Sequence, residues 1–475
     1  MIVRQSISIV TLQISIVLLL MGCNTNKRKS PTSENSTQTS EKQPTATTAS
    51  AKQLFTEHCK GCHGQAANDF VAHDWKYGNS KEEIYNSISN GMPENGMPAY
   101  DKTFTTTEIE QLTAYIIEDL EQEAAVVPQP VTKSPDVELE TVVTNREIPW
   151  AIEVTADGTI YFTERQGTLS YIPPGGQAIA VSGVPQVLNE RQGGLLDLKL
   201  HPDFAANKQL FLSYSKPGTN GLATTAVCSA TLEGNALTNV TDIFVAKPYY
   251  KTQHHYGSRL AFDKAGLLYI TVGDRGNRDV FPQSLENGCG KVHRITITGE
   301  VPADNPFYKQ ANAVKSVWSY GHRNPQGLVY DQADNSLWEH EHGPKGGDEI
   351  NLIQKGLNYG WPVITYGVNY SGFPITKLKE KEGLEQPVSH WTPSIAPSGM
   401  DLVNDKRYGN WEGCLLSGSL KFDYISKVTL KARKHVSEDK IFEGIGRVRE
   451  IEMGDDGFLY IGVENPGRIL KVIAN

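Results

Sequence analysis

The hydrophobic positions of the chain fall into three zones with different periodicity. Residues 7–21 form a nearly continuous apolar run. In the second zone apolar residues recur three or four positions apart, which predicts short helices over 51–60, 81–90 and 107–121. From residue 137 onward, short β-type runs alternate with turn residues. The pattern therefore predicts a small all-α domain followed by a large all-β domain.

One unit recurs in the β-rich zone: a turn residue, a spacer and a short β-type run. Six copies occur, at Asp157–Tyr161, Asn207–Phe211, Gly266–Tyr269, Asn335–Trp338, Trp411–Leu415 and Asp456–Tyr460. A four-stranded propeller blade takes about 40 to 50 residues, and the middle copies lie farther apart than that. We therefore expect a six-bladed β-propeller with long loops inserted in its middle blades. Inserted loops and the axial channel are where a propeller carries its functional residues.

The apolar run near the N-terminus is a targeting segment. It follows Arg4 and ends at Cys23, and it is too short to span a bilayer, which needs about 20 apolar residues. Its Leu-x-x-Gly-Cys ending resembles a bacterial lipoprotein signal, in which Cys23 is lipidated and becomes the mature N-terminus. A plain signal peptide with a chance cysteine is the alternative. Both interpretations predict export, and the first predicts a lipid anchor on the periplasmic side of a bacterial membrane.

Composition separates the folded zones from the connecting segments. Residues 24–50 contain no aromatic residue and 12 Ser or Thr, so they cannot build a core. A second, proline-bearing break lies before the β-rich zone. The predicted organisation is a signal at 1–23, a disordered tether at 24–50, a helical domain at 51–123, a linker at 124–136 and a propeller at 137–475.

Charge narrows the possible partners. The net charge is -9, which argues against nucleic-acid binding because phosphate contacts need a surplus of Lys and Arg. The helical domain carries most of this charge, with 5 Lys and no Arg against 13 Asp and Glu in residues 51–123. Such a surface suits docking to a basic redox partner. A solvated acidic surface explains the charge equally well.

The helical domain contains a C-x-x-C-H sequence. In this arrangement two thiols, here Cys59 and Cys62, bond covalently to a haem while the adjacent His63 ligates the iron. A disulfide or redox C-x-x-C pair is the alternative. Since a chain of about 70 residues is marginal without a cofactor in its core, we expect one covalent haem c surrounded by short helices.

The sixth iron ligand should be a thioether downstream of the motif. Met92 and Met97 are the candidates, each followed by Pro. Met97 is preferred because Met97–Tyr100 resembles the Met-Pro-Ala-aromatic turn of small bacterial cytochromes c. His58 and His73 are not expected to ligate the iron. A Met ligand raises the haem potential, so the haem should accept electrons readily.

Polar clusters in the β-rich zone mark candidate chemistry. The run Gln253–Arg259 precedes a strand and contains a histidine that could act as a general base or be structural. The run Glu341–Glu349 combines carboxylates with a Gly-rich backbone, which suits a Ca²⁺ site or an ordinary acidic turn. Arg447 and Arg449 share one strand face, and Lys421 follows another strand. Directed inward, these cations suit a polyanionic ligand, and directed outward they form a solvated face.

Together these segments resemble the soluble pyrroloquinoline-quinone (PQQ) sugar dehydrogenases, especially the broad-specificity aldose dehydrogenases. The resemblance covers nearly all of 137–475 and rests on ordered motifs at 192–196, 201–204, 254–259, 321–327, 343–349 and 358–362. It implies a six-bladed propeller, in agreement with the repeat count. It also implies oxidation of aldose sugars at C1 to lactones, with PQQ and Ca²⁺ as cofactors.

The resemblance implies a role for each matching residue. His255 would take the proton from the sugar, Gln192 would orient cofactor and substrate, and Arg323 would polarise the quinone. Other quinone contacts would come from Asn324, Lys421, Arg447 and Arg449. A Ca²⁺ at the quinone would be held by the carbonyls of Gly343 and Pro344. A structural Ca²⁺ would be held by Asp348, Glu349 and the Tyr359 carbonyl. Substrate contacts would come from Gln192, His254 and Trp391.

One departure limits what the resemblance implies. The glucose-dehydrogenase branch has Asp immediately before the base, where this chain has His254, so glucose specificity is not expected.

The fusion of the two domains predicts that the haem of the same chain takes electrons from reduced quinone and passes them to a downstream acceptor. The alternatives are a non-enzymatic ligand-binding propeller tethered to a cytochrome and a haem-only shuttle. Three cysteines remain unassigned: Cys228, Cys289 and Cys414.

Overall fold

The structure is a computed structural model that describes residues 48–59, 80–92, 97, 99–124, 137–464 and 466–474. Several predicted features lie outside the described residues: the signal at 1–23, the tether up to residue 47, the linker from residue 125 to residue 136, and the residues Cys23, Cys62, His63 and His73. Among the described helices, none is both long and apolar enough to cross a membrane.

Within the described residues 48–59, 80–92, 97 and 99–124, the helical unit has three helices of α type and one turn of π type. Their bounds are α1 Thr48–Leu54, η1 Phe55–Cys59, α3 Lys81–Asn90 and α4 Thr106–Ala124. Each predicted helix is therefore confirmed, with ends that differ by up to three residues. The core is formed by Phe55, Ile84, Ile88, Phe104, Ile109, Leu112 and Ile116.

Reciprocal caps fix where α3 and α4 begin. The Ser80 hydroxyl accepts a hydrogen bond from the Glu83 N–H at 3.3 Å, and the Glu83 carboxylate accepts one from the Ser80 N–H at 2.9 Å. Thr105 and Glu108 make the same pair of bonds before α4, at 3.3 and 2.8 Å. These capping boxes satisfy backbone N–H groups that the first helical turn leaves without partners.

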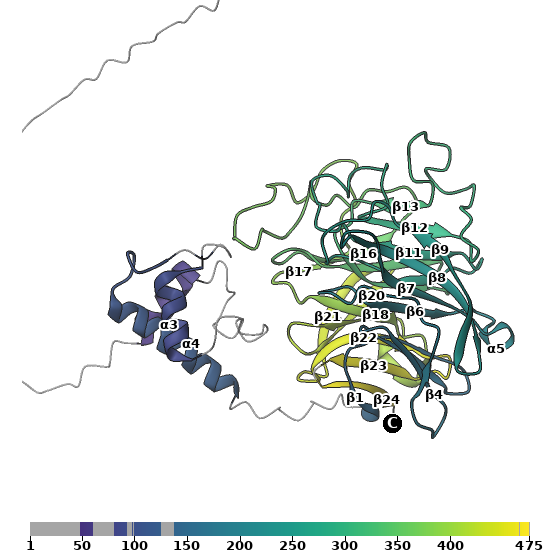
Figure 1. The fold of residues 1–475 in the computed structure, drawn as a ribbon, viewed down its shortest axis with the longest axis horizontal. Coiled ribbons are helices and arrows are strands. Elements are labelled where there is room, and N and C mark those ends of the chain that lie inside the picture. Colours follow the sequence, from purple (N-terminus) through teal and green to yellow (C-terminus); the bar gives the residue numbers. More distant parts are fainter. Residues whose placement is uncertain are drawn as a thin grey trace, which may run out of the picture. The chain divides into compact units, whose positions relative to one another are not determined.

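The β-rich zone folds into six four-stranded antiparallel sheets, the blades of a propeller (Figure 1). Blade 1 is β2 (Pro149–Val154), β3 (Ile160–Glu164), β4 (Thr168–Ile172) and β5 (Ile179–Val181). Blade 2 is β6 (Leu195–Leu200), β7 (Gln209–Pro217), β8 (Ala223–Glu233) and β9 (Ala236–Val245). Blade 3 is β10 (Leu260–Phe262), β11 (Leu268–Val272), β12 (Lys291–Ile295) and β13 (Val317–Tyr320).

The other three blades follow in chain order, and the last one closes the ring. Blade 4 is β14 (Pro325–Asp331), β15 (Ser336–Glu341), β16 (Asp348–Ile353) and β17 (Ser389–Trp391). Blade 5 is β18 (Pro397–Leu402), β19 (Leu415–Ser419), β20 (Ile425–Lys431) and β21 (Lys434–Ile441). Blade 6 is β22 (Arg447–Met453), β23 (Leu459–Glu464), β24 (Gly467–Ala474) and β1 (Val137–Arg146). Two short helices, α5 (Phe204–Asn207) and η4 (Lys406–Trp411), lie between strands.

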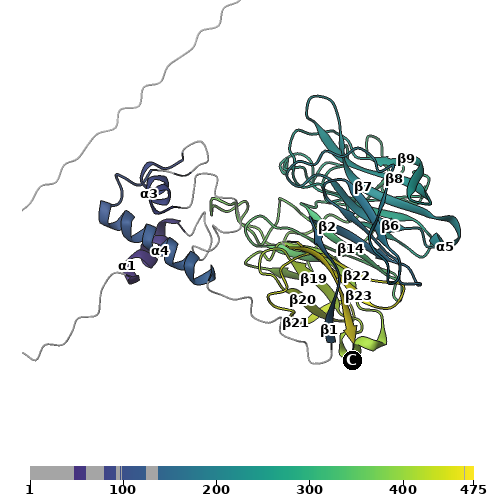
Figure 2. The same cartoon turned by 60° about the horizontal axis from the view of Figure 1, so that its bottom comes forward.

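The propeller closes in two ways. The first strands of successive blades contact one another around a complete ring, β2, β6, β10, β14, β18 and β22. In blade 6 the N-terminal strand β1 pairs antiparallel with the C-terminal strand β24, and Figure 2 shows β1 beside this C-terminal sheet. Separate hydrophobic clusters fill the spaces between neighbouring blades. The ring of first strands therefore surrounds the axis, and the core lies between the blades.

The six repeat copies all mark the same place in the fold. Each copy runs into or begins the second strand of its blade, namely β3, β7, β11, β15, β19 and β23. These strands are buried almost throughout, because they have sheet neighbours on both sides and blades against both faces. The predicted six-bladed propeller is confirmed. The long connections lie in blades 3 and 4: between β11 and β12, between β12 and β13, and between β16 and β17.

Candidate active site

The long connections of blades 3 and 4 enclose a cavity of about 280 Å³. Its walls come from the segment before β10, the β11–β12, β15–β16 and β16–β17 connections and the turn before β14. The lining residues are His254, His255, Asp274, Gly276, Asn277, Arg278, Asp279, Arg323, Pro344, Trp361, Asn369 and Tyr370. The cavity therefore contains four of the residues predicted from the sequence, and it lies among the inserted loops where function was expected.

His255 is held in one orientation by two partners. Its backbone has φ of 56°, in the left-handed region, and its N–H donates to the Gln192 side-chain oxygen at 2.7 Å. Its ring Nδ1 lies 2.7 Å from the Asp274 carboxylate. Gln192 and His255 are thus brought together as predicted. Asp274 was not predicted, although it lies two residues after β11, the strand that the Gly266–Tyr269 copy begins.

The electrostatics of this pair make His255 a neutral base. Burial, reinforced by the positive charge of Arg323, lowers the pKa of His255 to about 4. Burial opposes ionisation of Asp274, but His255, Arg323 and the Gly276 N–H together hold its pKa below the ordinary value. Asp274 is therefore a carboxylate and accepts a hydrogen bond from the Nδ1–H group of His255. This tautomer leaves the Nε2 lone pair of His255 available to accept a proton.

Asp274 is itself fixed by further hydrogen bonds. Its second carboxylate oxygen accepts from the indole N–H of Trp361 at 2.8 Å, and its first accepts from the Gly276 N–H at 2.7 Å. The Arg323 guanidinium lies over the Trp361 ring, 5.4 Å from its centroid. Trp361 belongs to the motif at 358–362, but sequence reasoning gave it no role. Trp361 lines the cavity, and it also orients the carboxylate of Asp274, which in turn orients His255.

Arg323 is anchored from blade 4. Its Nη1 donates to the His342 carbonyl at 2.9 Å and the Gly343 carbonyl at 2.8 Å. The backbone N–H groups of Arg323 and Asn324 both donate to one oxygen of Glu341. The side-chain oxygen of Asn324 accepts from the Gly257 N–H at 3.3 Å, which links Asn324 to the loop that carries His255.

A second cationic group forms on blades 5 and 6. Arg447 and Arg449 both pair with Glu464 on β23, at 3.2 and 2.6 Å. Arg447 also donates to the Leu420 carbonyl, next to Lys421. The structure thus brings Arg447 and Arg449 together and adds a carboxylate, Glu464, that sequence reasoning missed. Lys421 is the residue next to Leu420, and its ammonium lies over the Phe422 ring, 5.0 Å from the centroid. Two arginines against one carboxylate leave this group with an excess of positive charge.

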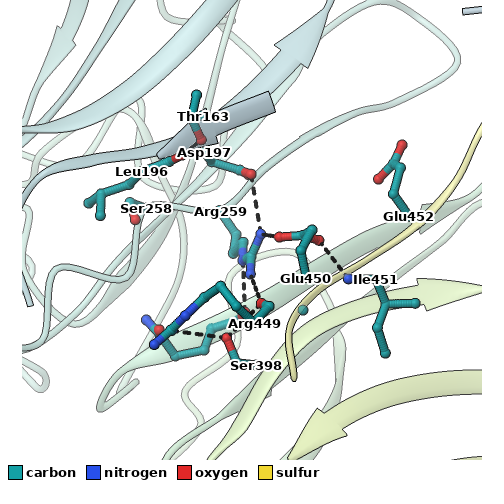
Figure 3. Close-up of polar contacts among 12 residues, drawn as sticks. Thr163, Leu196, Asp197, Ser258, Arg259, Ser398, Arg449, Glu450, Ile451 and Glu452 are labelled. Carbon is teal, nitrogen blue, oxygen red and sulfur yellow. Dashed lines mark hydrogen bonds and ion pairs between the residues drawn. The ribbon is translucent and has the colours of Figure 1, made fainter. Parts of the chain in front are cut away.

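A buried arginine connects Arg449 to the other blades (Figure 3). Arg259, 3% exposed, pairs with Asp197 on β6 and with Glu450 on β22. It also donates to the Arg449 carbonyl at 3.2 Å and to the Gln326 carbonyl on β14 at 2.8 Å. Because unpaired buried charges are costly, this network fixes the first strands of four blades relative to one another.

The structure separates Asp348 from Glu349, two of the residues predicted to hold a structural Ca²⁺. Asp348 and Glu349 are successive residues on β16, so their side chains point to opposite faces of the sheet. The Asp348 carboxylate accepts hydrogen bonds from the Gly343, Ile395 and Ala396 N–H groups and the Ser394 hydroxyl. Asp348 is therefore satisfied by protein donors, and the expectation that it shares one ion with Glu349 and Tyr359 is not supported.

Trp391, expected to contact substrate, is not among the residues that line this cavity. Its ring is buried in the cluster between blades 4 and 5, and its indole N–H donates to Glu438 at 2.8 Å. The indole that lines the cavity belongs to Trp361. His254 does line the cavity: its ring lies 4.6 Å from that of His255 and packs so closely against Gly276 that a Cβ added there would clash with it.

The helical unit distinguishes the two candidate thioether ligands. Met92 and Met97 pair through backbone hydrogen bonds of 2.8 and 3.1 Å. Met97 packs against the helical core, as does Cys59 of the C-x-x-C-H sequence. Met92 is not part of this described cluster. The geometry thus favours Met97 as the inward-directed sulfur.

In the propeller, Cys228, Cys289 and Cys414 are buried thiols and form no disulfide with one another.

Two family models match this chain. The one described as Glucose / Sorbosone dehydrogenase covers residues 146–471. The one described as Cytochrome C oxidase, cbb3-type, subunit III, covers residues 46–116. The two matches fall on the propeller and on the helical unit, respectively.

Relatives and solved structures agree with these matches. Aldose sugar dehydrogenase YliI of Escherichia coli (strain K12) is 41% identical over 71% of this chain and 92% of the relative. Quinoprotein glucose dehydrogenase B of Acinetobacter calcoaceticus is 27% identical over 71% of this chain and 88% of the relative. The apo-form crystal structure of the soluble aldose sugar dehydrogenase from E. coli is 39% identical, with a TM-score of 0.69 over 71% of this chain and all of that chain.

A ligand-bound neighbour has the same fold. The PQQ-bound form of aldose sugar dehydrogenase from Streptomyces coelicolor is 25% identical, with a TM-score of 0.59 over 73% of this chain and 99% of that chain. The cavity with its His255–Asp274 pair, the six blades and these matches lead to one conclusion. The chain belongs to the glucose/sorbosone dehydrogenase family, as a PQQ-type aldose sugar dehydrogenase joined to an N-terminal cytochrome c domain.

Proposed function

We propose that this protein oxidises aldose sugars at C1 to lactones with PQQ and Ca²⁺, and passes the electrons to the covalent haem c of the same chain. The observation that carries the proposal is the cavity in which a neutral His255, oriented by Asp274, lies beside Arg323. A binding module would need neither a base poised to accept a proton nor a cation beside it.

The residues present fit the two cofactors. PQQ carries carboxylates, and Arg447 and Arg449, which share one carboxylate, offer an excess of positive charge for them. Lys421 would add a further cation. Ca²⁺ prefers oxygen ligands. The Gly343 carbonyl accepts a hydrogen bond from Arg323 and Pro344 lines the cavity, so the carbonyls of these two residues would be the ligands. When bound, PQQ would supply the hydride acceptor and Ca²⁺ would polarise its reactive carbonyl.

The chain itself supplies the proton transfer and the charge stabilisation. His255 Nε2 would accept the proton of the sugar hydroxyl, because Asp274 holds Nδ1 as the donor. The resulting imidazolium would be stabilised by the Asp274 carboxylate, as in other His–Asp pairs. Arg323, fixed by the carbonyls of His342 and Gly343, would stabilise negative charge that develops in the cavity.

The cytochrome domain completes the reaction. Sugar oxidation releases two electrons, whereas a haem accepts one, so the downstream acceptor would have to reoxidise the haem between two successive one-electron transfers. Met97 is proposed as the sixth iron ligand because it packs against the helical core beside Cys59. From the haem the electrons would go to a downstream acceptor.

We further propose that the protein is exported and held at the membrane by a lipid on Cys23.

Two variants test the proposal in the full chain. With PQQ and Ca²⁺ at saturation, His255→Ala should bind PQQ as the wild type does and lose about 10² to 10⁴ in the rate of sugar oxidation. Arg447→Ala should weaken PQQ binding and retain turnover at saturating cofactor. PQQ titration and dye-linked sugar oxidation measure both. Wild-type turnover in His255→Ala would refute the assignment of the base.

A further inference from the structure

The open end of the cavity carries an exposed aromatic side chain. Tyr370 lines the cavity, yet it is 66% exposed. The pair proposed to accept the proton lies deeper, because the side chains of His255 and Asp274 are only 13% and 1% exposed. Exposure therefore increases along the cavity from the base to Tyr370, which places this ring where the cavity opens to solvent.

Tyr370 belongs to a turn that hydrogen bonds hold in one shape. The Asn369 N–H donates to the Phe373 carbonyl at 2.9 Å, and the Gly372 N–H donates to the Asn369 carbonyl at 2.8 Å. The side-chain NH₂ of Asn369 donates to the carbonyls of Phe373 and Pro374, at 3.0 and 3.3 Å. Gly372 has φ of 85°, a conformation that glycine adopts without strain. The backbone on both sides of Tyr370 is thus fixed.

Two further contacts join this turn to the other walls of the cavity. Arg278, in the β11–β12 connection, donates from Nη1 to the Asn369 side-chain oxygen at 2.7 Å. The Lys345 N–H, in the β15–β16 connection, donates to the Val368 carbonyl at 3.1 Å. Three connections therefore hold the turn in place. A ligand that binds to the exposed ring does not first have to order the backbone that carries it, which favours binding.

An aromatic ring in this position suits a sugar ring. One face of a pyranose presents C–H groups with a small positive charge, whereas the face of an aromatic ring is negative. Stacking the two rings also removes apolar surface of both from water. The tyrosine hydroxyl lies at the ring edge, where it can stay in water or form a hydrogen bond with a sugar hydroxyl.

The proposed reaction sets the direction in which a substrate extends from the base. His255 acts on the C1 hydroxyl, so the C1 end of the sugar lies at the buried end of the cavity. In a 1,4-linked disaccharide the second ring is attached at C4, on the side of the reducing ring opposite C1. The second ring therefore extends toward the open end of the cavity, where Tyr370 lies.

On the basis of the proposed function, we propose that Tyr370 forms an outer sugar subsite, on which the second ring of a 1,4-linked reducing oligosaccharide stacks. A monosaccharide that reacts at His255 does not reach this subsite. Because the stacked ring is remote from C1, its contact is made equally in the bound substrate and in the transition state. The outer subsite should therefore lower KM for oligosaccharides without changing kcat.

Steady-state kinetics of the full-length protein, loaded with PQQ and Ca²⁺, test the outer subsite with glucose and maltose as the two substrates and an artificial dye as acceptor. Tyr370→Ala should raise KM for maltose by about 3- to 10-fold, the effect of losing one aromatic contact. Its kcat for maltose and both constants for glucose should not change. Tyr370→Phe keeps the ring and should retain the wild-type KM. Phe373→Ala is the matched control, since Phe373 is 73% exposed on the same turn but is not part of the cavity lining.

Saturation-transfer NMR measures the contact itself. The loaded protein is mixed with excess maltose without any electron acceptor, so that nearly all of the sugar stays unoxidised. The C–H protons of the second ring should receive saturation from the wild type and from Tyr370→Phe, and lose most of it with Tyr370→Ala.

An unchanged KM for maltose in Tyr370→Ala, or an equal rise in KM for both sugars, would overturn the outer subsite. So would a second ring that receives no saturation from the wild type, or as much from Tyr370→Ala as from the wild type; Tyr370 is then an ordinary exposed residue. A wild type that oxidises neither sugar would contradict the proposed function instead, and the NMR measurement would still decide whether the outer subsite exists.

Discussion

Replacing Asp274 by Asn tests how the cavity activates its base. Asp274 accepts three hydrogen bonds in the structure, from His255, the Gly276 N–H and Trp361. Asn has one oxygen and one NH₂ group, so it cannot accept all three. If its oxygen faces His255 and Gly276, its NH₂ meets the Trp361 N–H. If it is turned over, its NH₂ faces His255 and the imidazole proton moves to Nε2, so that the base is lost.

The size of the effect follows from these contacts. A hydrogen bond to a charged group contributes about 1.5 to 3 kcal/mol, which corresponds to about 10- to 10²-fold in rate at 1.36 kcal/mol per factor of ten. Loss of the correct tautomer removes general-base catalysis, worth about 10² to 10⁴. We therefore expect kcat of Asp274→Asn to fall by at least about 10², with PQQ affinity unchanged, because the residues proposed to bind the cofactor are intact.

The assay is steady-state sugar oxidation with an artificial dye, measured from pH 3.5 to pH 8 on the full chain with PQQ and Ca²⁺. The wild-type kcat/KM should fall on the acid side as His255 is protonated, near its pKa of about 4. The Asp274→Asn variant lacks the negative charge that favours the imidazolium, so its acid limb should move to lower pH. Asp279→Asn is the matched control, since this carboxylate also lines the cavity but is 79% exposed and pairs with Arg278. An Asp274→Asn enzyme with the turnover of the wild type and an unshifted acid limb would refute the reasoning.

Three further predictions concern separate parts of the chain. Met97→Ala should abolish the thioether absorption of the haem and lower its potential, whereas Met92→Ala should change neither; the reverse result would exchange the two assignments. His254→Ala should change the ratio of kcat/KM between a monosaccharide and a disaccharide by about tenfold, because His254 shapes the cavity wall; an unchanged ratio would exclude it from substrate selection. Burial lowers the pKa of His340 to about 3, so the unfolded chain binds a proton there below pH 6.5 that the folded chain does not. Stability contributed by neutral His340 is thus present above pH 6.5 and lost as the pH falls. In His340→Gln the unfolding free energy should therefore change less with pH, by about 1 kcal/mol per pH unit between pH 6 and pH 5. An identical slope in urea titrations of both proteins would contradict this.

The fold could be predicted because its signals are local. The second strand of each blade is buried on both faces, so its apolar run and the preceding turn stand out six times in the sequence. The helices of the cytochrome unit were visible for a similar reason, since their apolar residues keep helical spacing and their first turns carry capping residues. None of these signals required knowledge of distant contacts.

The site was harder to predict because its partners come from different blades. Asp274 and Trp361 are far apart in the sequence, and only the packing of blades 3 and 4 brings the carboxylate between His255 and the indole. Trp391 packs between blades 4 and 5 and does not line the cavity, because the position of a residue along the chain does not show which way its ring points. Asp348 and Glu349 were grouped as neighbours in sequence, although strand geometry directs them to opposite faces.

The central claim, that sugar electrons pass from the propeller to the haem of the same chain, is tested most directly by stopped-flow reduction of the haem. The full-length protein, loaded with PQQ and Ca²⁺, is mixed with an aldose, and the reduced haem band is followed over a range of protein concentrations. The account predicts a haem reduction rate that depends on sugar and PQQ and is independent of protein concentration. A rate proportional to protein concentration, or haem reduction by sugar without PQQ, would contradict it.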